Sequence, residues 1–531
     1  MSGPAAPRGL MGEMPLTLDL VLRRIETVAA PLTVTSATPE GPLRHTWGEI
    51  ALASRRLVSA LRTLAIPADA PVATLAHNSH RHLELFYGVP CSGRVLHPLN
   101  ARVPAQQLIG QLERCGDGAI FIDASLTGML AEHRDRLPRV VVVMDDDAPV
   151  AAPFGDAPRY AQLVAGAEPA RELGPMSEGQ ALCICHTSGT TGAARAVVYS
   201  HRSVVLHALG ALGVDSHGVS RGSVVLPLTP MFHLMAWGFP YSAALAPASL
   251  VLAGADTSPD ALATLIERER VTLAAGIPTF WVRLLEALED PSRDLSSLRR
   301  VLSGGAAAPR SLAKRYLAAG VEFVSSWGMT EAGSGTTLRL EDAAALANEG
   351  PSVAQGAAIA GVELRITAPD GAELPWDGVA SGELEARGPW VARAYLDDDP
   401  GAFHDGWLRT GDVARIAPGG SVEIVDRLKD LIKSGGEWIS STELEGALSR
   451  VPGVAEAAVI AVADEQWGER PLALLVAAPG HEIDAGAVRE ALREQLPRWW
   501  VPDRLEVLDE LPKTTVGKVD KQRLRERYAT E

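Results

Sequence analysis

The sequence predicts an α/β fold in which a large N-terminal body with mostly parallel sheets precedes a small α/β domain. Short apolar runs alternate with segments of helical periodicity through most of the chain, which is typical of parallel sheets covered by helices. The chain has 531 residues, more than one hydrophobic core normally holds, so several subdomains are expected. Two extended segments, 361–367 and 382–387, predict a small antiparallel β-subdomain within the body.

Helices are predicted where apolar residues recur with helical spacing, and strands where short apolar runs lie between turn residues. The predicted helices span residues 16–29, 45–64, 106–115, 204–212, 259–268, 279–288, 443–450 and 487–495. The predicted strands span residues 71–76, 118–123, 139–144, 181–185, 197–199, 224–228, 272–275, 300–303, 321–325, 455–462, 472–477 and 505–507. Thr442 is expected to cap the helix at 443–450.

Residues 235–255 carry no charge and are long enough to raise the question of a membrane span. Gly238, Pro240 and Pro247 interrupt this stretch, so a buried helix followed by a strand is predicted instead.

The composition is that of a soluble globular protein, with 47% hydrophobic and 21% charged residues. The 49 basic and 65 acidic residues give a net charge of −16, which argues against a nucleic-acid partner and against general attraction to an anionic membrane. The 4 cysteines do not form a disulfide framework, and Cys183 and Cys185 are expected in the core. Residues 1–14 show no secretory pattern, so a cytoplasmic location is expected.

A loop of small and hydroxylated residues is predicted between the strands at 181–185 and 197–199. It contains, in order, Thr187, Ser188, Gly189, Thr190, Thr191 and Gly192, with Arg195 shortly after. Glycine lets backbone N–H groups approach anionic oxygens, and the hydroxyls and the cation add further donors. The pattern favours polyphosphate binding over a merely solvated loop, although the Gly-Lys-Ser/Thr ending of the common nucleotide loop is missing.

Two later strands are followed by residues that suit a nucleotide. Gly304, Gly305, Ala306 and Ala307 follow the first, and Ser326, Trp327, Gly328, Met329, Thr330 and Glu331 follow Ser325 at the end of the second. Small residues permit close approach of a ligand, and an aromatic face can stack on adenine. Thr330 can donate to a phosphate, and Glu331 can bind Mg²⁺.

His233 and Trp237 follow the predicted strand at 224–228. Side chains just beyond the C-terminal end of a strand in an open α/β sheet lie at a ligand crevice. The alternative interpretation is a core histidine and an aromatic plug.

The loop at 187–196, the following Val197-Val198-Tyr199-Ser200-His201-Arg202 and the segment at 97–102 resemble the AMP-forming adenylating superfamily of acyl-CoA synthetases, luciferases and adenylation domains. The chain looks most like bacterial medium- and long-chain fatty-acyl-CoA synthetases, and the resemblance covers essentially all of it. It departs at Ala194-Arg195-Ala196, where the family usually has Pro-Lys-Gly. Arginine keeps the positive charge there but not the compact ammonium geometry.

The resemblance implies how the nucleotide and the acid are bound. Asp412 would hold the ribose hydroxyls, and Arg427 would reach the nucleotide. Thr187 and Glu331 would hold Mg²⁺, and Lys518 would enter the site during adenylation. His233 and Trp237 would border the acyl tunnel.

The resemblance also implies a mobile C-terminal domain. Lys429 would be the pivot between an adenylating domain at 1–428 and a mobile domain at 429–531, and Lys433 would lie near the phosphate. Gly435 and Gly436 would leave room for the pantetheine of CoA, beside a wall formed by Trp438.

The implied activity has two half-reactions. The carboxylate of a fatty or aryl acid attacks the α-phosphorus of ATP to give acyl-AMP and pyrophosphate, and the thiol of CoA then displaces AMP. One alternative is an adenylating enzyme of specialised metabolism that uses another acceptor or activates a small oxyanion such as nitrite. Another is a nucleotide-binding protein without turnover, against which the presence of Lys518, Glu331 and Asp412 argues. The sequence leaves open whether the chain is a monomer or a homodimer.

Overall fold

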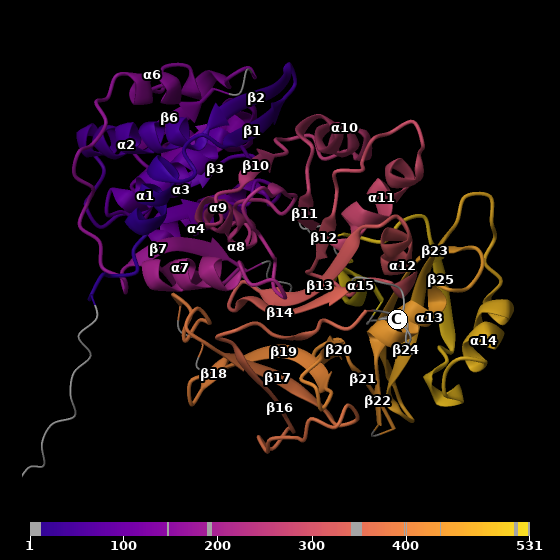
Figure 1. Cartoon of the computed structure of the whole chain (residues 1–531). Helices are drawn as coiled ribbons and strands as arrows, with labels where there is room; N and C mark the ends of the chain where they lie inside the picture. Colours follow the sequence, from indigo (N-terminus) through magenta and orange to yellow (C-terminus); the bar gives the residue numbers. More distant parts are fainter. Residues whose placement is uncertain are drawn as a thin grey trace, which may run out of the picture.

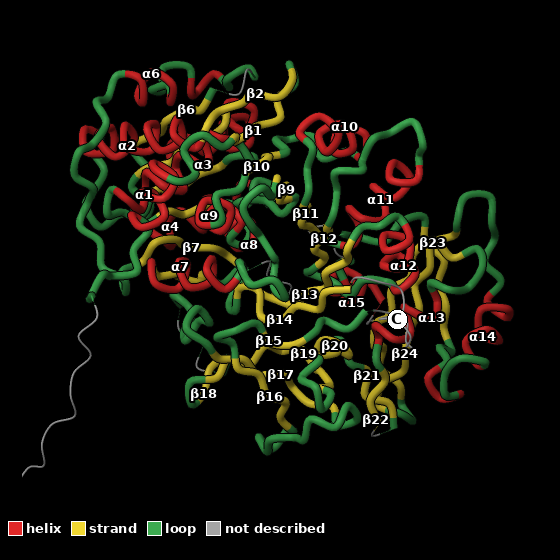
Figure 2. Tube along the Cα trace, viewed as in Figure 1, coloured by secondary structure: helices red, strands yellow, loops and turns green. Residues whose placement is uncertain are grey.

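The computed structural model describes residues 12–145, 148–187, 194–340, 353–397, 399, 401–435, 437–513 and 519–528. Among these residues the strands form four sheets: two large and mostly parallel, one small and antiparallel, and one near the C-terminus (Figure 1). Most helices gather around the two large sheets, whereas strands and loops make up the β-subdomain (Figure 2). No helix of the described part combines the length and the apolar character needed to cross a membrane.

The largest sheet has nine strands in the order β15-β14-β13-β12-β11-β9-β10-β1-β2. Its middle is parallel, and β2, β14 and β15 add antiparallel edges. The bounds are β1 Thr33–Thr38, β2 Gly41–Thr46, β9 Val224–Pro227, β10 Ser249–Leu252, β11 Leu273–Gly276, β12 Arg300–Ser303, β13 Glu322–Met329, β14 Gly333–Leu340 and β15 Ala357–Ala358.

The second sheet has six strands in the order β6-β5-β3-β4-β7-β8, parallel except at β8. The bounds are β3 Val72–Leu75, β4 Leu96–Pro98, β5 Ala119–Asp123, β6 Val140–Met144, β7 Ala181–His186 and β8 Ala196–Ser200. The helices of the body are α1 Asp19–Thr27, α2 Trp47–Thr63, α3 His80–Cys91, α4 Ala105–Cys115, α5 Thr127–Leu130, α6 Tyr160–Ala165, α7 His201–Gly210, α8 Leu234–Trp237, α9 Phe239–Leu245, α10 Pro259–Glu269, α11 Pro278–Glu289 and α12 Arg310–Ala318.

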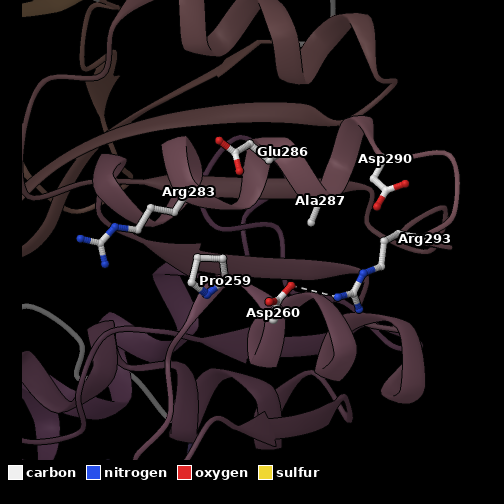
Figure 3. A pocket seen from close by; sticks show the side chains of 7 residues that line it. All are labelled: Pro259, Asp260, Arg283, Glu286, Ala287, Asp290 and Arg293. Atoms are coloured by element: carbon white, nitrogen blue, oxygen red, sulfur yellow. Dashed lines mark hydrogen bonds and ion pairs between the residues drawn. The ribbon is translucent and has the colours of Figure 1, made fainter. Parts of the chain in front are cut away.

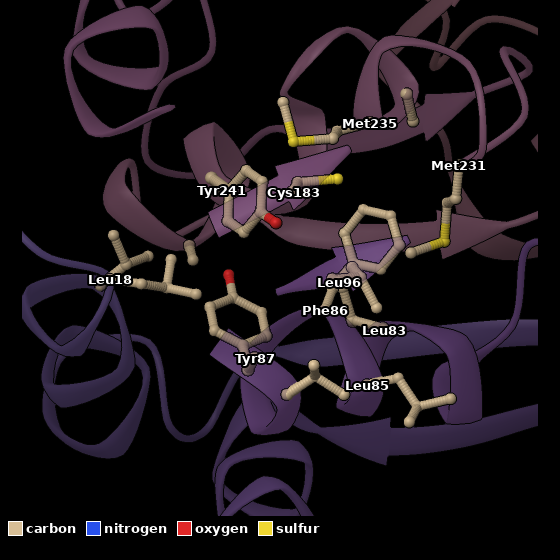
Figure 4. Close-up of a cluster of buried hydrophobic side chains, with 14 of the residues drawn as sticks. Leu18, Leu83, Leu85, Phe86, Tyr87, Leu96, Cys183, Met231, Met235 and Tyr241 are labelled. Carbon is tan, nitrogen blue, oxygen red and sulfur yellow. The ribbon is translucent and has the colours of Figure 1, made fainter. Parts of the chain in front are cut away.

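Successive residues of a strand point to opposite sides of its sheet. In the two large sheets both of these sides are buried in apolar clusters. In β9, Val225 faces a core that the two sheets share, whereas Leu226 faces the cluster beneath α10, α11 and α12. Figure 4 shows part of the shared core, where Phe86 and Tyr87 of α3 lie near Tyr241 of α9 and Cys183 of β7. The predicted strands are thus apolar throughout because both of their sides lie in a core.

The small antiparallel sheet lies below the largest sheet in Figure 1. Its strands are β16 Glu363–Thr367, β17 Ser381–Arg387, β18 Phe403–His404, β19 Trp407–Ile416 and β20 Val422–Arg427. Its core includes Trp327 of β13 and Trp390, so the β-subdomain packs against the end of the largest sheet.

The C-terminal region has its own sheet and its own cores. The sheet contains β21 Ile432–Ser434, β22 Glu437–Ile439, β23 Val454–Asp464, β24 Gly468–Ala477 and β25 Arg504–Leu508, and the helices are α13 Ser441–Leu448, α14 Ala485–Arg493 and α15 Lys521–Tyr528. Two apolar clusters drawn only from residues 432–528 lie on opposite faces of this sheet.

The predicted α/β class and mostly parallel body are confirmed, and the uncharged stretch at 235–255 is indeed a buried helix and strand. The cap at Thr442 is wrong. Ser440 is the N-cap of α13, with its hydroxyl accepting from the Glu443 N–H at 3.1 Å, whereas the Thr442 hydroxyl donates to Asp426. The strand predicted to end at Ser325 continues to Met329, because β14 pairs with it.

Candidate active site

The predicted phosphate loop is the turn of a hairpin between β7 and β8, which are antiparallel. Thr187 and Arg195 close its neck: the Thr187 N–H donates to the Arg195 carbonyl at 2.9 Å, and the Arg195 N–H donates to Thr187 Oγ1 at 3.1 Å. Ser188, Gly189, Thr190, Thr191 and Gly192 lie outside the described residues. The frame of the loop is therefore fixed by backbone pairing on both sides.

The Arg195 side chain lies at the surface beside the neck. Its guanidinium pairs with Asp399 and lies 4.4 Å from the ring centre of Tyr395. The neighbouring Ala194 and Ala196 are buried at 4% and 0% exposure, so the two alanines of the unusual triplet pack inward while the cation stays accessible.

Tyr395 connects this cation to the predicted metal-binding carboxylate. Its hydroxyl donates to Glu331 Oε1 at 2.5 Å, and the Glu331 residue is only 4% exposed. Burial first, and then the negative charge of Glu331, raise the pKa of Tyr395 far above its ordinary value, so it remains a donor. Glu331 therefore contacts the hydroxyl of the same aromatic ring over whose face the Arg195 guanidinium lies.

Trp327 and Asp412 meet where the largest sheet joins the β-subdomain. The Trp327 indole N–H donates to Asp412 Oδ2 at 2.8 Å, and Arg427 Nε lies 2.6 Å from Asp412 Oδ1. Gly335 lies beneath the indole, since a Cβ there would be 2.4 Å from Trp327 Cζ3. Three residues predicted separately for the nucleotide are thus in direct contact.

The other small residues of the two strand ends line the same region of the sheet. Gly305 has a φ of +78°, which favours glycine, and Ala306 is exposed. Ser325 is buried, and the Ser326 hydroxyl donates to the Thr336 carbonyl at 2.9 Å, so both serines serve the sheet in this structure. At Gly328 a Cβ would lie 2.3 Å from the Gly333 carbonyl oxygen. Of the remaining residues of this strand end, Met329 is half-buried and the Thr330 carbonyl accepts from the Tyr199 hydroxyl.

The sequence of the chain that carries these residues matches the patterns of two known protein families. Residues 29–396 match the sequence pattern of the AMP-binding enzyme family, and residues 443–518 match that of the AMP-binding enzyme C-terminal domain. The chain belongs to the AMP-binding enzyme family.

Individual relatives cover nearly the whole of this AMP-binding enzyme. It is 38% identical to a medium-chain-fatty-acid–CoA ligase of Ectopseudomonas oleovorans over 495 residues, 91% of either chain. It is 39% identical to a 3-methylmercaptopropionyl-CoA ligase of Ruegeria pomeroyi over 532 residues, 98% of either chain. The ATP-bound structure of MatB from Rhodopseudomonas palustris superposes with a TM-score of 0.83 at 26% identity, covering 97% of this chain and 99% of that one. The predicted class, an AMP-forming acid–CoA ligase that uses ATP and CoA, is confirmed.

The segment predicted to border the acyl site has an unusual backbone. Leu234 to Trp237, labelled α8 in Figure 1, all have positive φ values between 48° and 54°, which forms a left-handed turn. Such a conformation costs roughly 1–2 kcal/mol for each residue with a side chain. The turn brings Trp237 so close to Gly304 that a Cβ there would lie 3.0 Å from Trp237 Cη2. His233, half-buried, immediately precedes it.

The predicted pivot lies in a turn between two sheets. Residues 428–431, with the turn at 428–430, join β20 of the β-subdomain to β21 of the C-terminal sheet. Asp426, at the end of β20, accepts from the Ser441 N–H at 2.6 Å and from its hydroxyl at 2.7 Å, and Asp430 pairs with Arg525. Desolvation lowers the pKa of Lys429 between them. Ionic and hydrogen-bonded contacts therefore hold both ends of this turn.

Lys433 and Trp438 are cross-strand partners in the hairpin of β21 and β22. The Lys433 ammonium lies 5.7 Å from the ring centre of Trp438, which is 47% exposed. Gly435 has a φ of +60°, and a Cβ there would be 2.9 Å from Trp467 Cε3, so the turn requires glycine. Gly436 lies outside the described residues, as does Lys518. A bridge between Lys513 and Val519 marks the two ends of the segment that carries Lys518.

A shallow surface hollow between α10 and α11 is unrelated to these residues. It is lined by Pro259, Asp260, Arg283, Glu286, Ala287, Asp290 and Arg293, and an Arg293–Asp260 ion pair of 3.0 Å crosses it (Figure 3). No candidate site residue lies among them.

Sequence reasoning missed Tyr395, Gly335 and Asp426. Tyr395 lies in a loop without a recognisable pattern, and Gly335 is one of two glycines in an unpredicted strand. Of these three residues, only Asp426 had a signal in the sequence, because it immediately precedes Arg427, to which the family resemblance assigns a role. Their roles depend on contacts with residues far away in the sequence.

Proposed function

We propose that this enzyme activates an apolar carboxylic acid with ATP and transfers the acyl group to CoA through residues around Tyr395, Trp327 and Asp412. The observation that carries the proposal is the chain of contacts from Arg195 through Tyr395 to Glu331, directly beside the neck of the phosphate loop. It joins a cation, a buried carboxylate and a hydroxyl-rich loop, the groups that a nucleoside triphosphate requires. The family membership and the acid–CoA ligase relatives support it.

The nucleotide is proposed to bind with its ribose at Asp412 and its phosphates at the hairpin loop. The Asp412 carboxylate can accept more than the two contacts it makes with Trp327 and Arg427. Arg195 would bind the β- and γ-phosphates, and its partner Asp399 would give way to them. Stabilising the charge that develops on the phosphates is the main task of such a site.

Glu331 and Thr187 fit the Mg²⁺ that ATP brings. Glu331 offers a buried carboxylate and Thr187 a hydroxyl at the neck of the loop, and oxygen atoms of these kinds are the ligands that Mg²⁺ prefers. The ion would neutralise phosphate charge. Tyr395 would hold the Glu331 carboxylate in place through its hydrogen bond.

Both half-reactions are proposed to use this one pocket with different faces of the C-terminal domain. Lys518 would stabilise the α-phosphate and the carboxylate during adenylation. A rotation about Lys429 would then bring Lys433, Gly435, Gly436 and Trp438 over the pocket for the attack of CoA. Trp438 is exposed in this structure, which suits a residue that lines the CoA channel only after the C-terminal domain has rotated.

The acid is proposed to lie against the left-handed turn at 234–237. Trp237 and His233 border the pocket there, and the surrounding cluster is apolar. A fatty acid of medium length or an aryl acid fits this chemistry better than nitrite, which has no apolar part to bury. A cytoplasmic location stays a prediction of the sequence, which leaves the oligomeric state open.

Pyrophosphate release tests the proposal. It should be measured with fatty acids of increasing length, aryl acids and nitrite, with and without CoA, beside a Glu331→Gln variant as a site-specific control. Release that depends on an apolar acid, with AMP and an acyl-CoA accumulating only when CoA is present, is the expected result. Release that is independent of the acid, or equal AMP formation without CoA, would contradict it.

A further inference from the structure

We propose that His97, His186 and Cys115 form a binding site for a Zn²⁺-like metal ion beneath the phosphate loop. The three residues come from different elements: His97 from β4, Cys115 from the end of α4, and His186 from the end of β7. Their ligand atoms all lie within 4.8 Å of one another. His186 immediately precedes Thr187, so the site adjoins the neck of the loop without belonging to the nucleotide pocket.

The distances between these atoms suit coordination of one ion. The two histidine Nε2 atoms are 2.9 Å apart, and the Cys115 sulfur is 3.9 Å from His186 Nε2. A tetrahedral zinc ion with bonds of roughly 2.0 Å to nitrogen and 2.3 Å to sulfur separates its ligand atoms by roughly 3.3–3.6 Å. The two observed distances lie on either side of that range, so small side-chain rotations suffice.

The hydrogen bonds on the far side of each ring aim both Nε2 atoms at the site. His97 Nδ1 lies 2.7 Å from Asp117 Oδ2, with both side chains fully buried, and His186 Nδ1 lies 3.4 Å from the Ala194 carbonyl. Because the Asp117 carboxylate accepts a hydrogen bond, His97 carries its proton on Nδ1. A carboxylate behind a metal-binding histidine is a common arrangement. His97 Nε2 is left with a lone pair that faces His186 Nε2, and His186 offers its own Nε2 lone pair once its proton lies on Nδ1, against the Ala194 carbonyl.

Without an ion, the 2.9 Å between the two Nε2 atoms is the length of a neutral N–H···N hydrogen bond, which His186 can donate to His97. A metal ion uses both lone pairs at once, and Cys115 adds a third ligand. Two imidazoles and a thiolate favour Zn²⁺ over Mg²⁺ or Ca²⁺, which prefer oxygen.

The ion would join β4, α4 and β7 just below the hairpin. His186 already contacts Ala194 across the neck, so the ion would steady both ends of the phosphate loop. We therefore assign it a positioning role, not a catalytic one.

Metal content and cobalt spectroscopy of the full-length protein test the site. After dialysis against a chelator and addition of ZnCl₂, the native chain should retain one zinc per chain on gel filtration. With Co²⁺ it should show a thiolate-to-cobalt charge-transfer band. Cys115→Ala should abolish that band and weaken zinc binding at least about a hundredfold, and Asp117→Asn should weaken zinc binding roughly ten- to a hundredfold. Thermal melting confirms that each variant is folded.

The other sulfur pair provides the matched control. Cys183 and Cys185 have sulfur atoms 3.8 Å apart in the core, so they are the competing thiol site. The double variant Cys183→Ala/Cys185→Ala should bind zinc as the native chain does. Failure of the native chain to retain zinc would overturn the proposal. Zinc binding that survives Cys115→Ala unchanged, or that disappears in the double variant, would overturn it as well.

Discussion

The indole nitrogen of Trp327 donates a hydrogen bond of 2.8 Å to Asp412 Oδ2, and this contact joins the largest sheet to the β-subdomain. It places the strand end predicted for the adenine next to the carboxylate predicted for the ribose. The other oxygen of Asp412 contacts Arg427, the last residue before the turn at 428–430. The proposed nucleotide site is thus linked through two contacts to the turn about which the C-terminal domain is proposed to move.

Arg195 is predicted to serve the pyrophosphate half of ATP. Arg195→Ala should raise the KM for ATP while leaving the affinity for AMP nearly unchanged, because AMP lacks the β- and γ-phosphates. Titration calorimetry with AMP and a non-hydrolysable ATP measures both. Arg195→Lys should recover most of the ATP affinity, since the family usually has lysine there.

The ion pair with Asp399 provides a matched control for Arg195. Asp399→Asn frees the guanidinium and should lower the KM for ATP severalfold. An equal loss of AMP and ATP affinity in Arg195→Ala would place this cation elsewhere.

Much of the fold follows from local patterns, and much of the site does not. The apolar runs of β5 and β12 predict buried strands, because both faces of each strand lie in a core. The antiparallel pairing with β14 extends β13 to Met329, beyond the end predicted at Ser325, since glycines and serines give a weak strand signal. No sequence pattern predicts the role of Tyr395, because its partners Arg195 and Glu331 lie far away in the sequence. Contacts between distant residues are what a single sequence conceals.

Lys518 is predicted to act in the first half-reaction only. Lys518→Ala should reduce acyl-AMP formation by roughly two to three orders of magnitude, the usual effect of removing one electrostatic stabiliser. Thioester formation from supplied acyl-AMP should change far less. Single-turnover assays of the two steps provide the measurement.

Lys513 is the matched control for Lys518, because it lies in the same segment but pairs with Glu456 at the surface. Lys513→Ala should leave both steps near normal. Equal losses of both steps in Lys518→Ala would refute the assignment.

Lys429 is predicted to absorb the backbone rotation between the half-reactions. Proline fixes φ and removes an N–H, so Lys429→Pro should trap one arrangement and lose one half-reaction severely while sparing the other. Any rotation must also break the contacts of Asp426 with Ser441. The test compares single-turnover acyl-AMP formation with thioester formation from pre-made acyl-AMP.

Lys429→Ala separates loss of the side chain from loss of backbone freedom, and should retain more of both steps than the proline variant. Normal rates of both steps in a folded Lys429→Pro protein would exclude this pivot. Thermal melting must first exclude misfolding if both steps are lost.

Glu84 is predicted to make stability depend on pH. Burial raises the pKa of this carboxyl to about 7, against the opposing effects of the Tyr160 hydrogen bond and Arg81. The folded state therefore holds a proton that the unfolded chain releases above its ordinary pKa. The contribution of Glu84 to the free energy of unfolding is complete below pH about 4.5. It falls by up to about 3 kcal/mol as the pH rises through 7.

Glu84→Gln keeps an acceptor for the Tyr160 hydroxyl, which contacts Glu84 Oε2 at 2.6 Å, but cannot titrate. Thermal melting between pH 4.5 and 7 should show a smaller decline in stability for the variant than for the native chain. Parallel declines would show that Glu84 does not carry the effect.

The fate of the carboxylate oxygen tests the central claim most directly. The enzyme should be incubated with ATP, CoA and a medium-chain fatty acid whose carboxylate carries ¹⁸O, and the AMP should be analysed by mass spectrometry. If the carboxylate attacks the α-phosphorus and CoA then displaces AMP, each AMP will carry one labelled oxygen. AMP without label, or label in inorganic phosphate instead, would contradict acyl-adenylate formation at this site.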